Sequence, residues 1–458
     1  MDSRLLKILI VCTLASFLTP FMGSSIGLAI PSIARDLNSN AVAVNWVLTS
    51  FLLASAACLL PFGRLADMKG RRSIFMMGLA VFAVSSVLCG AAASLILLVV
   101  ARVLQGIGGA MMFSTGMAIL TASFPVEKRG MVLGFNAGTV YVGLALGPVL
   151  GGLMTDMLGW RSIFLTVGVL AVGVVGAAWI WLPNDTRAFS FKDYDKVGAL
   201  LITFSIVAII FGAEQETLWI ALAGTIGLIL FWLHERRAKV PLLDVKVFAN
   251  NTAFTFSNLA ALINYAATYS NTYLLSMYLQ MVRGMKPQHA GMILLIQPVF
   301  MAVLSPVTGY LSDKMQPRLV ASLGMAITAA GMFLMAFIGP QTSIGLILVY
   351  LAVLGIGFAL FASPNNNAIM SSVEKRYFGV ASSTLGTARL VGQAMSMALV
   401  AFIFAQYIGR VKITPALAPG LLASNRMAFL LFGTLCVIGI LASISRGKAE
   451  REEPASGA

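Results

Sequence analysis

Charged residues are scarce in this sequence. They make up 10% of the 458 residues, whereas hydrophobic residues make up 59%. Soluble globular chains contain about 25% charged residues, so the polar surface of a soluble protein is missing here. Apolar runs recur along the chain, each near the roughly 20 residues that cross a bilayer as a helix. The alternating segments of about ten residues that build a membrane β-barrel are absent. The sequence therefore predicts an all-α polytopic membrane protein.

Cysteine and histidine are also few, and this excludes several kinds of site. The four cysteines lie inside apolar runs without a CxxC spacing, so neither zinc nor a disulfide framework is expected. His234 and His289 are far apart and lack ligand-like neighbours, so we expect no metal. A nucleophile–base pair is missing too. The glycine-rich segment 106–109 lies inside an apolar run with no strand before it, so it is not a nucleotide-binding loop. We therefore expect neither enzymatic activity nor a cofactor.

Acidic residues are missing from the middle of every apolar run. Asp67 and Asp313, for example, lie at the ends of runs. A proton relay inside a membrane usually needs a buried carboxylate or histidine. This absence leaves open a facilitator or importer of a small polar solute that works without proton coupling.

The apolar runs predict about fourteen transmembrane helices. They cover residues 6–30, 43–63, 73–93, 96–121, 131–155, 161–182, 197–213, 217–233, 254–280, 289–311, 318–338, 343–368, 379–407 and 425–445. An even number places both termini on one side, and most of the 31 basic residues fall on that side. Because basic loops stay in the cytoplasm, both termini are expected there, in the inner membrane of a prokaryote. The net charge of +14 is thus a topology signal, and no nucleic-acid partner is expected.

A short charged segment after the second run has a partial copy after the tenth. Residues 63–72 read GRLADMKGRR, and residues 309–314 read GYLSDK. Their equivalent places predict two six-helix bundles, a plan common among transporters that have a site between repeated halves. The expected division is an N-terminal bundle over 1–185, two linker helices over 186–252, a C-terminal bundle over 253–446 and a disordered cytoplasmic tail over 447–458.

Two arginines fall inside apolar runs. Arg102 lies in the fourth run with Gln105 one turn later, and Arg389 lies deeper, in the thirteenth. An arginine inside a membrane costs about 2.5–3.5 kcal/mol on insertion scales, so each is expected to face a wet cavity or a partner. The alternative for Arg102 is a side chain that extends to the membrane surface. Other polar or aromatic residues inside the runs are also candidates to line the substrate cavity: Asn45, Trp46, Asn136, Tyr141, Asn264, Tyr265 and Gln297.

The fifth run carries glycines at every fourth position. Gly143, Gly147 and Gly151 share one helix face, and Pro148 removes a backbone hydrogen bond and favours a bend. Such a face suits a helix that slides against another, or static close packing alone.

These motifs together resemble the major facilitator superfamily, and within it the fourteen-span drug–proton antiporters of the multidrug efflux type. Segment 63–72 resembles that superfamily's cytoplasmic signature, segment 102–110 its span-four motif and segment 143–152 the span-five motif of exporters. The resemblance implies the major facilitator fold and alternating access, with the proton gradient as the energy source. One departure is Met22, which stands where the family normally has an aspartate.

The resemblance also implies roles for the charged segments. Gly63, Arg64, Asp67, Arg71, Arg72 and Asp313 would form a conformational gate. Asp67 would meet the start of the thirteenth run near 376–379, and Asp313 the start of the fifth near 128–130, because a helix N-terminus attracts a carboxylate. Arg64, Arg71 and Arg72 would supply breakable ion pairs. The expected partners are a small amphipathic substrate and the lipid bilayer, with the protein a monomer. A channel is disfavoured, because the gate motifs point to bundles that rock.

Overall fold

The computed structural model describes residues 3–39, 41–184, 194–214, 217–238, 240–243, 251–285, 287–408 and 418–446. Within these ranges the regular structure is helical and no strand is present. The first helices are α1 (Ser3–Asp36), α2 (Ala41–Lys69), α3 (Arg71–Gly90), α4 (Leu95–Ser123), α5 (Arg129–Leu158), α6 (Arg161–Trp181), α7 (Lys196–Glu214) and α8 (Leu218–Glu235). The later ones are α10 (Thr252–Thr268), α11 (Asn271–Met277), α12 (Pro287–Leu294), α13 (Ile296–Lys314), α14 (Pro317–Met335), α15 (Ile344–Ser371), α16 (Phe378–Tyr407) and α17 (Ala418–Ser445).

Eleven helical segments of the described chain are long and apolar enough to cross a membrane, and α7 and α8 are shorter apolar helices. The helix predicted over 254–280 is interrupted. It ends at Thr268, restarts at Asn271 as α11 and finishes as the π-helical turn η3 (Tyr278–Val282). Ser270 lies in the break, where its backbone N–H donates to the Ser396 hydroxyl of α16 at 3.1 Å. This side-chain acceptor replaces the helical carbonyl, which the apolar pattern could not reveal.

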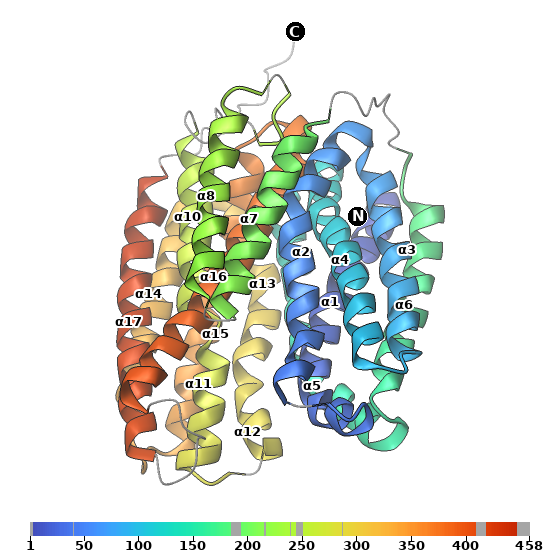
Figure 1. The fold of residues 1–458 in the computed structure, drawn as a ribbon. Coiled ribbons are helices and arrows are strands. Elements are labelled where there is room, and N and C mark those ends of the chain that lie inside the picture. The colour runs from blue at the N-terminus through green and yellow to red at the C-terminus, as the bar shows by residue number, and fades with distance from the viewer. Residues whose placement is uncertain are drawn as a thin grey trace.

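The helices form two groups that lie side by side (Figure 1). Helices α1–α6 lie on one side and α10–α17 on the other, with α7 and α8 across the front of the boundary. Within the first group α1 packs on α5, and α4 packs on α2 and α3. Within the second, α15 packs on α13 and α14, and α10 packs on α16 and α17. The main contacts between the groups are made by α5 with α13 and by α2 with α16.

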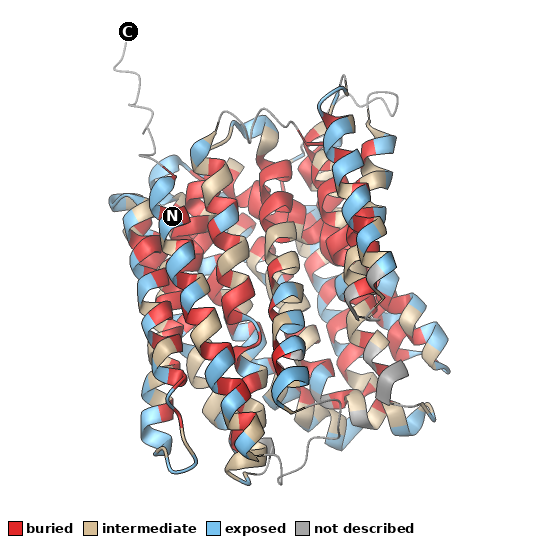
Figure 2. Ribbon diagram, turned by 60° about the vertical axis from the view of Figure 1, so that its left-hand side comes forward, coloured by how far each residue is buried: buried red, intermediate tan, exposed pale blue. Residues whose placement is uncertain are grey.

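Burial follows this arrangement (Figure 2). Buried residues line the inner faces of the helices, and exposed ones lie on the outer faces. Many outer residues are large and apolar, such as Ile96 and Trp179, which are 76% and 70% exposed. An apolar outer surface is unfavourable in water and suits the hydrocarbon of a bilayer. Because the outer surface faces lipid, we expect the functional side chains at the boundary between the two groups, in the interior of the molecule.

Candidate functional site

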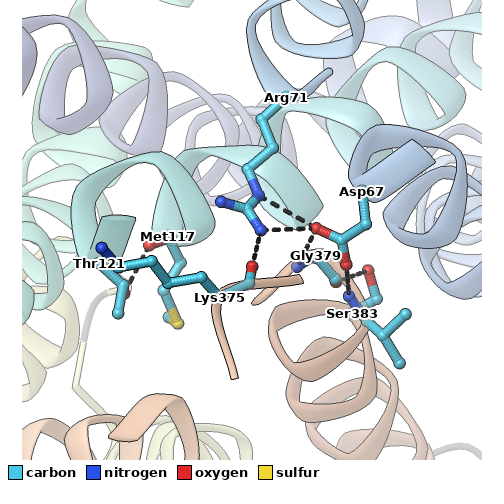
Figure 3. Close-up of polar contacts among 8 residues, drawn as sticks. Asp67, Arg71, Met117, Thr121, Lys375, Gly379 and Ser383 are labelled. Atoms are coloured by element: carbon cyan, nitrogen blue, oxygen red, sulfur yellow. Dashed lines mark hydrogen bonds and ion pairs between the residues drawn. The ribbon is translucent and has the colours of Figure 1, made fainter. Parts of the chain in front are cut away.

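The first contact between the groups joins the end of α2 to the start of α16 (Figure 3). The Asp67 carboxylate accepts hydrogen bonds from the backbone N–H groups of Gly379 and Val380, each at 3.0 Å. The first N–H groups of a helix have no partner within the helix and carry partial positive charge, so a carboxylate satisfies them well. Asp67 is 6% exposed. The contact predicted between Asp67 and the start of the thirteenth span is therefore confirmed.

Arg71 extends this contact to α3. Its guanidinium donates to the Asp67 carboxylate at 3.0 and 2.9 Å and also to the backbone carbonyl of Lys375. Lys375 belongs to η4 (Lys375–Tyr377), the turn that leads into α16. One arginine thus links α2 and α3 to the segment that precedes α16. We call Asp67, Arg71 and the amides that Asp67 binds the first latch.

The second latch has the same geometry with the groups exchanged. Asp313, near the end of α13, accepts hydrogen bonds from the backbone N–H groups of Gly130 at 2.6 Å and Met131 at 2.9 Å, at the start of α5. Arg71 lies four residues after Asp67, and the equivalent position, four residues after Asp313, is occupied by Pro317. The Asn367 side chain makes a longer contact with the Asp313 carboxylate, at 3.4 Å. The predicted contact of Asp313 with the start of the fifth span is likewise confirmed.

A short repeat precedes both capped helices. The sequence Val-Glu-Lys-Arg occurs at 126–129 and again at 373–376, and a 3-10 turn precedes each capped helix, at Val126–Lys128 and at Lys375–Tyr377. The two latches thus share a 3-10 turn followed by a capped helix. This similarity supports the interpretation of the two helix groups as related halves.

Glycines let the backbones approach closely at both latches. A Cβ atom added to Gly63 would lie 2.6 Å from the Gly379 carbonyl oxygen, and one added to Gly309 would lie 2.1 Å from that of Gly130. Real side chains do not tolerate such distances to backbone atoms. The glycine of each charged segment is therefore required for the helices to meet. The row continues on α5, where a Cβ added to Gly134 would lie 2.4 Å from the Ser305 carbonyl oxygen of α13.

Both latches lie on the same face of the molecule. The Phe378 ring lies 5.3 Å from the Arg71 guanidinium carbon and 5.6 Å from that of Arg129, which begins α5. Phe378 is 1% exposed, so it fills the space between the first latch and the start of α5. The sequence analysis missed this residue, because an apolar residue at the start of an apolar run carries no distinguishing signal.

The other predicted gate arginines behave differently from Arg71. Arg72 donates to the Trp179 carbonyl of α6 at 2.7 Å and lies 5.9 Å from the centre of that ring. Among the described residues, neither Arg64 nor Arg72 has an ion pair with a carboxylate. Of the three arginines, Arg71 forms an ion pair with a carboxylate within the described chain, and its breaking during transport stays a prediction.

A cluster of aromatic residues and one arginine lies at the boundary of the two groups, deeper than the latches. The Phe358 ring of α15 makes edge-to-face contacts with Tyr141 of α5 at 5.9 Å and with Tyr265 of α10 at 5.7 Å. Arg389 of α16 is within electrostatic reach of both phenols and lies 4.2 Å from the centre of the Phe113 ring of α4. The structure thus brings together three of the predicted cavity residues, Tyr141, Tyr265 and Arg389. Sequence reasoning missed Phe113 and Phe358, which look like ordinary core residues.

Arg102 and Gln105 lie elsewhere, inside the first helix group. Arg102 is 1% exposed, and its Nε donates to the Val47 carbonyl of α2 at 2.7 Å. It also donates to the Gln105 side chain, whose amide nitrogen donates to the Ser86 hydroxyl of α3 at 2.6 Å. The sequence predicted that this pair lines the substrate cavity, but in this conformation it does not. Arg102 does not extend to the membrane surface either. A chain of hydrogen bonds inside the bundle satisfies the arginine instead.

Several other predicted lining residues are also dispersed. Trp46 packs against Phe211 of α7, with ring centres 5.5 Å apart, so it faces a linker helix. The side chain of Asn45 lies outside the described residues. Gln297 of α13 accepts a hydrogen bond from Asn271 at 2.9 Å. Asn136 and Asn264 are buried, and each has a side-chain oxygen without a hydrogen-bond partner. Their contact with a substrate stays a prediction.

The predicted glycine face of α5 packs against α1. A Cβ atom added to Gly143, Gly147 or Gly151 would lie between 1.8 and 3.2 Å from atoms of α1, which belong to residues such as Phe17, Phe21, Ser24 and Ser25. The Ser25 hydroxyl donates to the Gly147 carbonyl at 3.0 Å, one residue before Pro148. This face thus holds two helices of the same group together. The face that meets the other group is a second glycine row, Gly130, Gly134 and Gly138.

Comparison with known proteins agrees with this geometry. The sequence matches the Major Facilitator Superfamily over residues 12–397 and 258–458. It is 27% identical over 451 residues to the riboflavin transporter RibZ of Clostridioides difficile (strain 630), covering 97% of this chain and 98% of RibZ. It is 28% identical to the tetracenomycin C resistance and export protein of Streptomyces glaucescens, covering 84% of this chain and 73% of that protein.

A solved structure shows the same fold. The proton:xylose symporter XylE superposes with a TM-score of 0.70 at 14% sequence identity, over 96% of this chain and 95% of XylE. Identity at this level shows the fold alone. The family match extends over most of the sequence and agrees with the paired latches and the helical architecture. The chain therefore belongs to the Major Facilitator Superfamily and is a multi-pass membrane transporter.

Proposed function

We propose that the protein exports small amphipathic compounds from the cytoplasm by alternating access, in exchange for protons. The observation that carries the proposal is the pair of latches, in which Asp67 and Asp313 each cap a helix of the opposite group. Two related contacts on one face suit a device that closes that face and later releases it. The export protein of Streptomyces glaucescens supports the direction of transport.

The proposed architecture is that of the fourteen-span drug–proton antiporters. The interrupted helix α10–α11, together with α7 and α8, would add to the eleven long segments to give fourteen crossings. The moving units are an N-terminal bundle over 1–185 and a C-terminal bundle over 253–446, with 186–252 as the linker. The tail, 447–458, lies outside the described residues. Both termini lie in the cytoplasm of a prokaryotic cell, the membrane is the inner membrane and the working unit is a monomer.

In this proposal the latches hold the cytoplasmic side closed. A compound from the cytoplasm reaches the boundary of the bundles only after α16 leaves Asp67 and α5 leaves Asp313. Water then replaces the lost hydrogen bonds, so the energy difference between the two states stays small enough for a transport cycle. Because glycine has no side chain, the helices can separate and pack together again along the glycine rows without changes of side-chain rotamer.

A second candidate is a facilitator or importer of a small polar solute without proton coupling. It is favoured by the absence of a carboxylate from the middle of the described spans, where Asp67 and Asp313 lie near span ends. The similarity to a riboflavin transporter supports it as well. In this reading the latches would work in the same way, and only the energy source would differ.

Transport by the purified full chain in lipid vesicles separates the two candidates. We use riboflavin and tetracenomycin C as probes, with the vesicle interior acidified relative to the medium. Antiport predicts accumulation of a probe above its outside concentration, which a protonophore abolishes. The facilitator predicts equal final concentrations with or without the pH gradient. If neither probe is ever accumulated under the gradient, the antiport proposal is wrong.

A further inference from the structure

Arg389 carries a positive charge into the boundary between the bundles, and no described residue forms an ion pair with it. It lies ten residues after Gly379 on α16, which places it about 15 Å from the first latch at 1.5 Å per residue. Its Nε atom is buried and has no hydrogen-bond partner. Among the residues that the structure describes, none gives its guanidinium a hydrogen bond or an ion pair. The Phe113 ring, at 4.2 Å, is a weaker cation–π neighbour.

The contrast with Arg102 shows that this arrangement is not the usual solution in this protein. Arg102 is also inside the membrane-spanning part, yet its guanidinium is bound by the Val47 carbonyl and the Gln105 side chain. Arg389 is half-buried, and its buried Nε atom has no such partner, which is costly unless another group accepts a hydrogen bond from it. Arg389 can therefore donate hydrogen bonds to a further group where the two bundles meet.

Aromatic side chains surround this unused donor. Tyr141 and Tyr265 are within electrostatic reach of Arg389, and both pack on Phe358. These residues come from α5, α10 and α15, so both helix groups contribute. Tyr141 lies eleven residues after Gly130 on α5, about 16 Å from the second latch at 1.5 Å per residue. The aromatic rings and Arg389 are thus at matching depths below the two latches.

We propose that Arg389 binds the anionic group of the substrate, while Tyr141, Tyr265 and Phe358 pack against its aromatic part. The substrate class is an amphipathic aromatic anion with a carboxylate, sulfonate or phosphate group. A guanidinium forms paired, charge-assisted hydrogen bonds with such groups, and aromatic rings supply apolar area with defined geometry. Cationic compounds are disfavoured, because they would meet a like charge at Arg389. The inference rests on the proposed transport function and specifies its substrate.

Equilibrium binding to the purified full chain tests the charge preference. The probes share one ring system: 2-naphthoate, its methyl ester and 2-naphthylmethylammonium, measured by calorimetry in detergent. We expect 2-naphthoate to bind at least about tenfold more tightly than the other two, as one charge-assisted hydrogen bond allows. In Arg389→Gln the affinity for 2-naphthoate falls by about 10- to 100-fold, and that for the ester stays the same. Arg389→Lys keeps part of the preference, since the charge remains but the paired geometry is lost.

The matched control is Arg318→Gln, which removes a half-exposed arginine at the start of α14 that donates to the Gln316 side chain. It leaves all three affinities unchanged. Thermal unfolding of each variant shows whether it is folded. The inference is overturned if the ammonium compound binds as tightly as 2-naphthoate, if Arg389→Gln weakens all three probes equally, or if the folded wild-type protein binds no 2-naphthoate. Because no gradient is involved, binding without uphill transport would refute the proposed export and leave this inference standing.

Discussion

Replacement of each latch aspartate by asparagine tests the closing mechanism directly. Asp67→Asn keeps the shape and one acceptor oxygen, and it removes the charge that two backbone amides and Arg71 share. Asp313→Asn does the same to the two backbone amides of the second latch. Asp156→Asn is the matched control, because this exposed aspartate lies at the other end of α5.

The expected loss of stability of the closed state, relative to the open state, follows from the hydrogen bonds that each variant loses. A hydrogen bond to a charged group contributes about 1.5–3 kcal/mol, and the charge–dipole attraction at a helix N-terminus about 0.3–1 kcal/mol. Asparagine retains one neutral bond, and water solvates the aspartate in the open state, so we expect a net loss of about 2 kcal/mol per latch. This changes the ratio of closed to open protein by about 30-fold. Asp67 and Asp313 bind amides of different helices, so the double variant should lose about 4 kcal/mol.

Distances between spin labels measure this ratio. Lys69 and Arg376 are exposed beside the first latch, and Lys128 and Lys314 beside the second. Cysteines at each pair, labelled and measured by double electron–electron resonance, should give a short distance in the wild type. A longer distance should gain population in each asparagine variant, and most in the double variant. Distances that stay as in the wild type, or that change equally in Asp156→Asn, would refute the reasoning.

Three further predictions concern the packing around the latches. Gly130→Ala places a Cβ atom 2.3 Å from the Gly309 carbonyl oxygen, so the closed distance should disappear from the label measurement, whereas Gly173→Ala, with no atom within 4 Å, should leave it unchanged. Phe378→Ala removes the ring between the latches and should cost the closed state about 3 kcal/mol, seen as the same widening with both aspartates intact. Arg102→Ala leaves buried polar groups without partners and should lower the free energy of unfolding by about 2–4 kcal/mol in a thermal or denaturant assay.

The helices could be predicted from the sequence because apolar runs are a local signal. The contacts of Asp67 and Asp313 with distant helix starts followed from the resemblance to a known family, and the structure shows both contacts. The break at Ser270 could not be predicted, because its cause is a hydroxyl on α16 that is distant in sequence. The sequence also does not show which side of a helix faces the substrate cavity. Trp46, for example, faces α7 and not the boundary between the groups.

The candidate substrate site was only partly predictable for the same reason. The sequence made both Arg102 and Arg389 candidates, with Arg389 the deeper of the two, and their partners in the structure distinguish them. Val47 and Gln105 satisfy Arg102, whereas among the described residues Arg389 has the Phe113 ring as its close neighbour. The sequence does carry a pattern that predicts the contact of α5 with the other group. The glycines at 130, 134 and 138 repeat every fourth position, as those at 143, 147 and 151 do.

The central claim is that the cytoplasmic ends of the bundles must separate in every transport cycle. A reversible cross-link tests it in vesicles. Cysteines replace the exposed residues Lys69 and Arg376, which flank the first latch, and a disulfide-forming bifunctional reagent joins them. With 2-naphthoate as the transported probe, we predict that cross-linking stops transport, that reduction restores it and that each single cysteine variant is unaffected. Transport at the full rate by cross-linked protein would contradict the account.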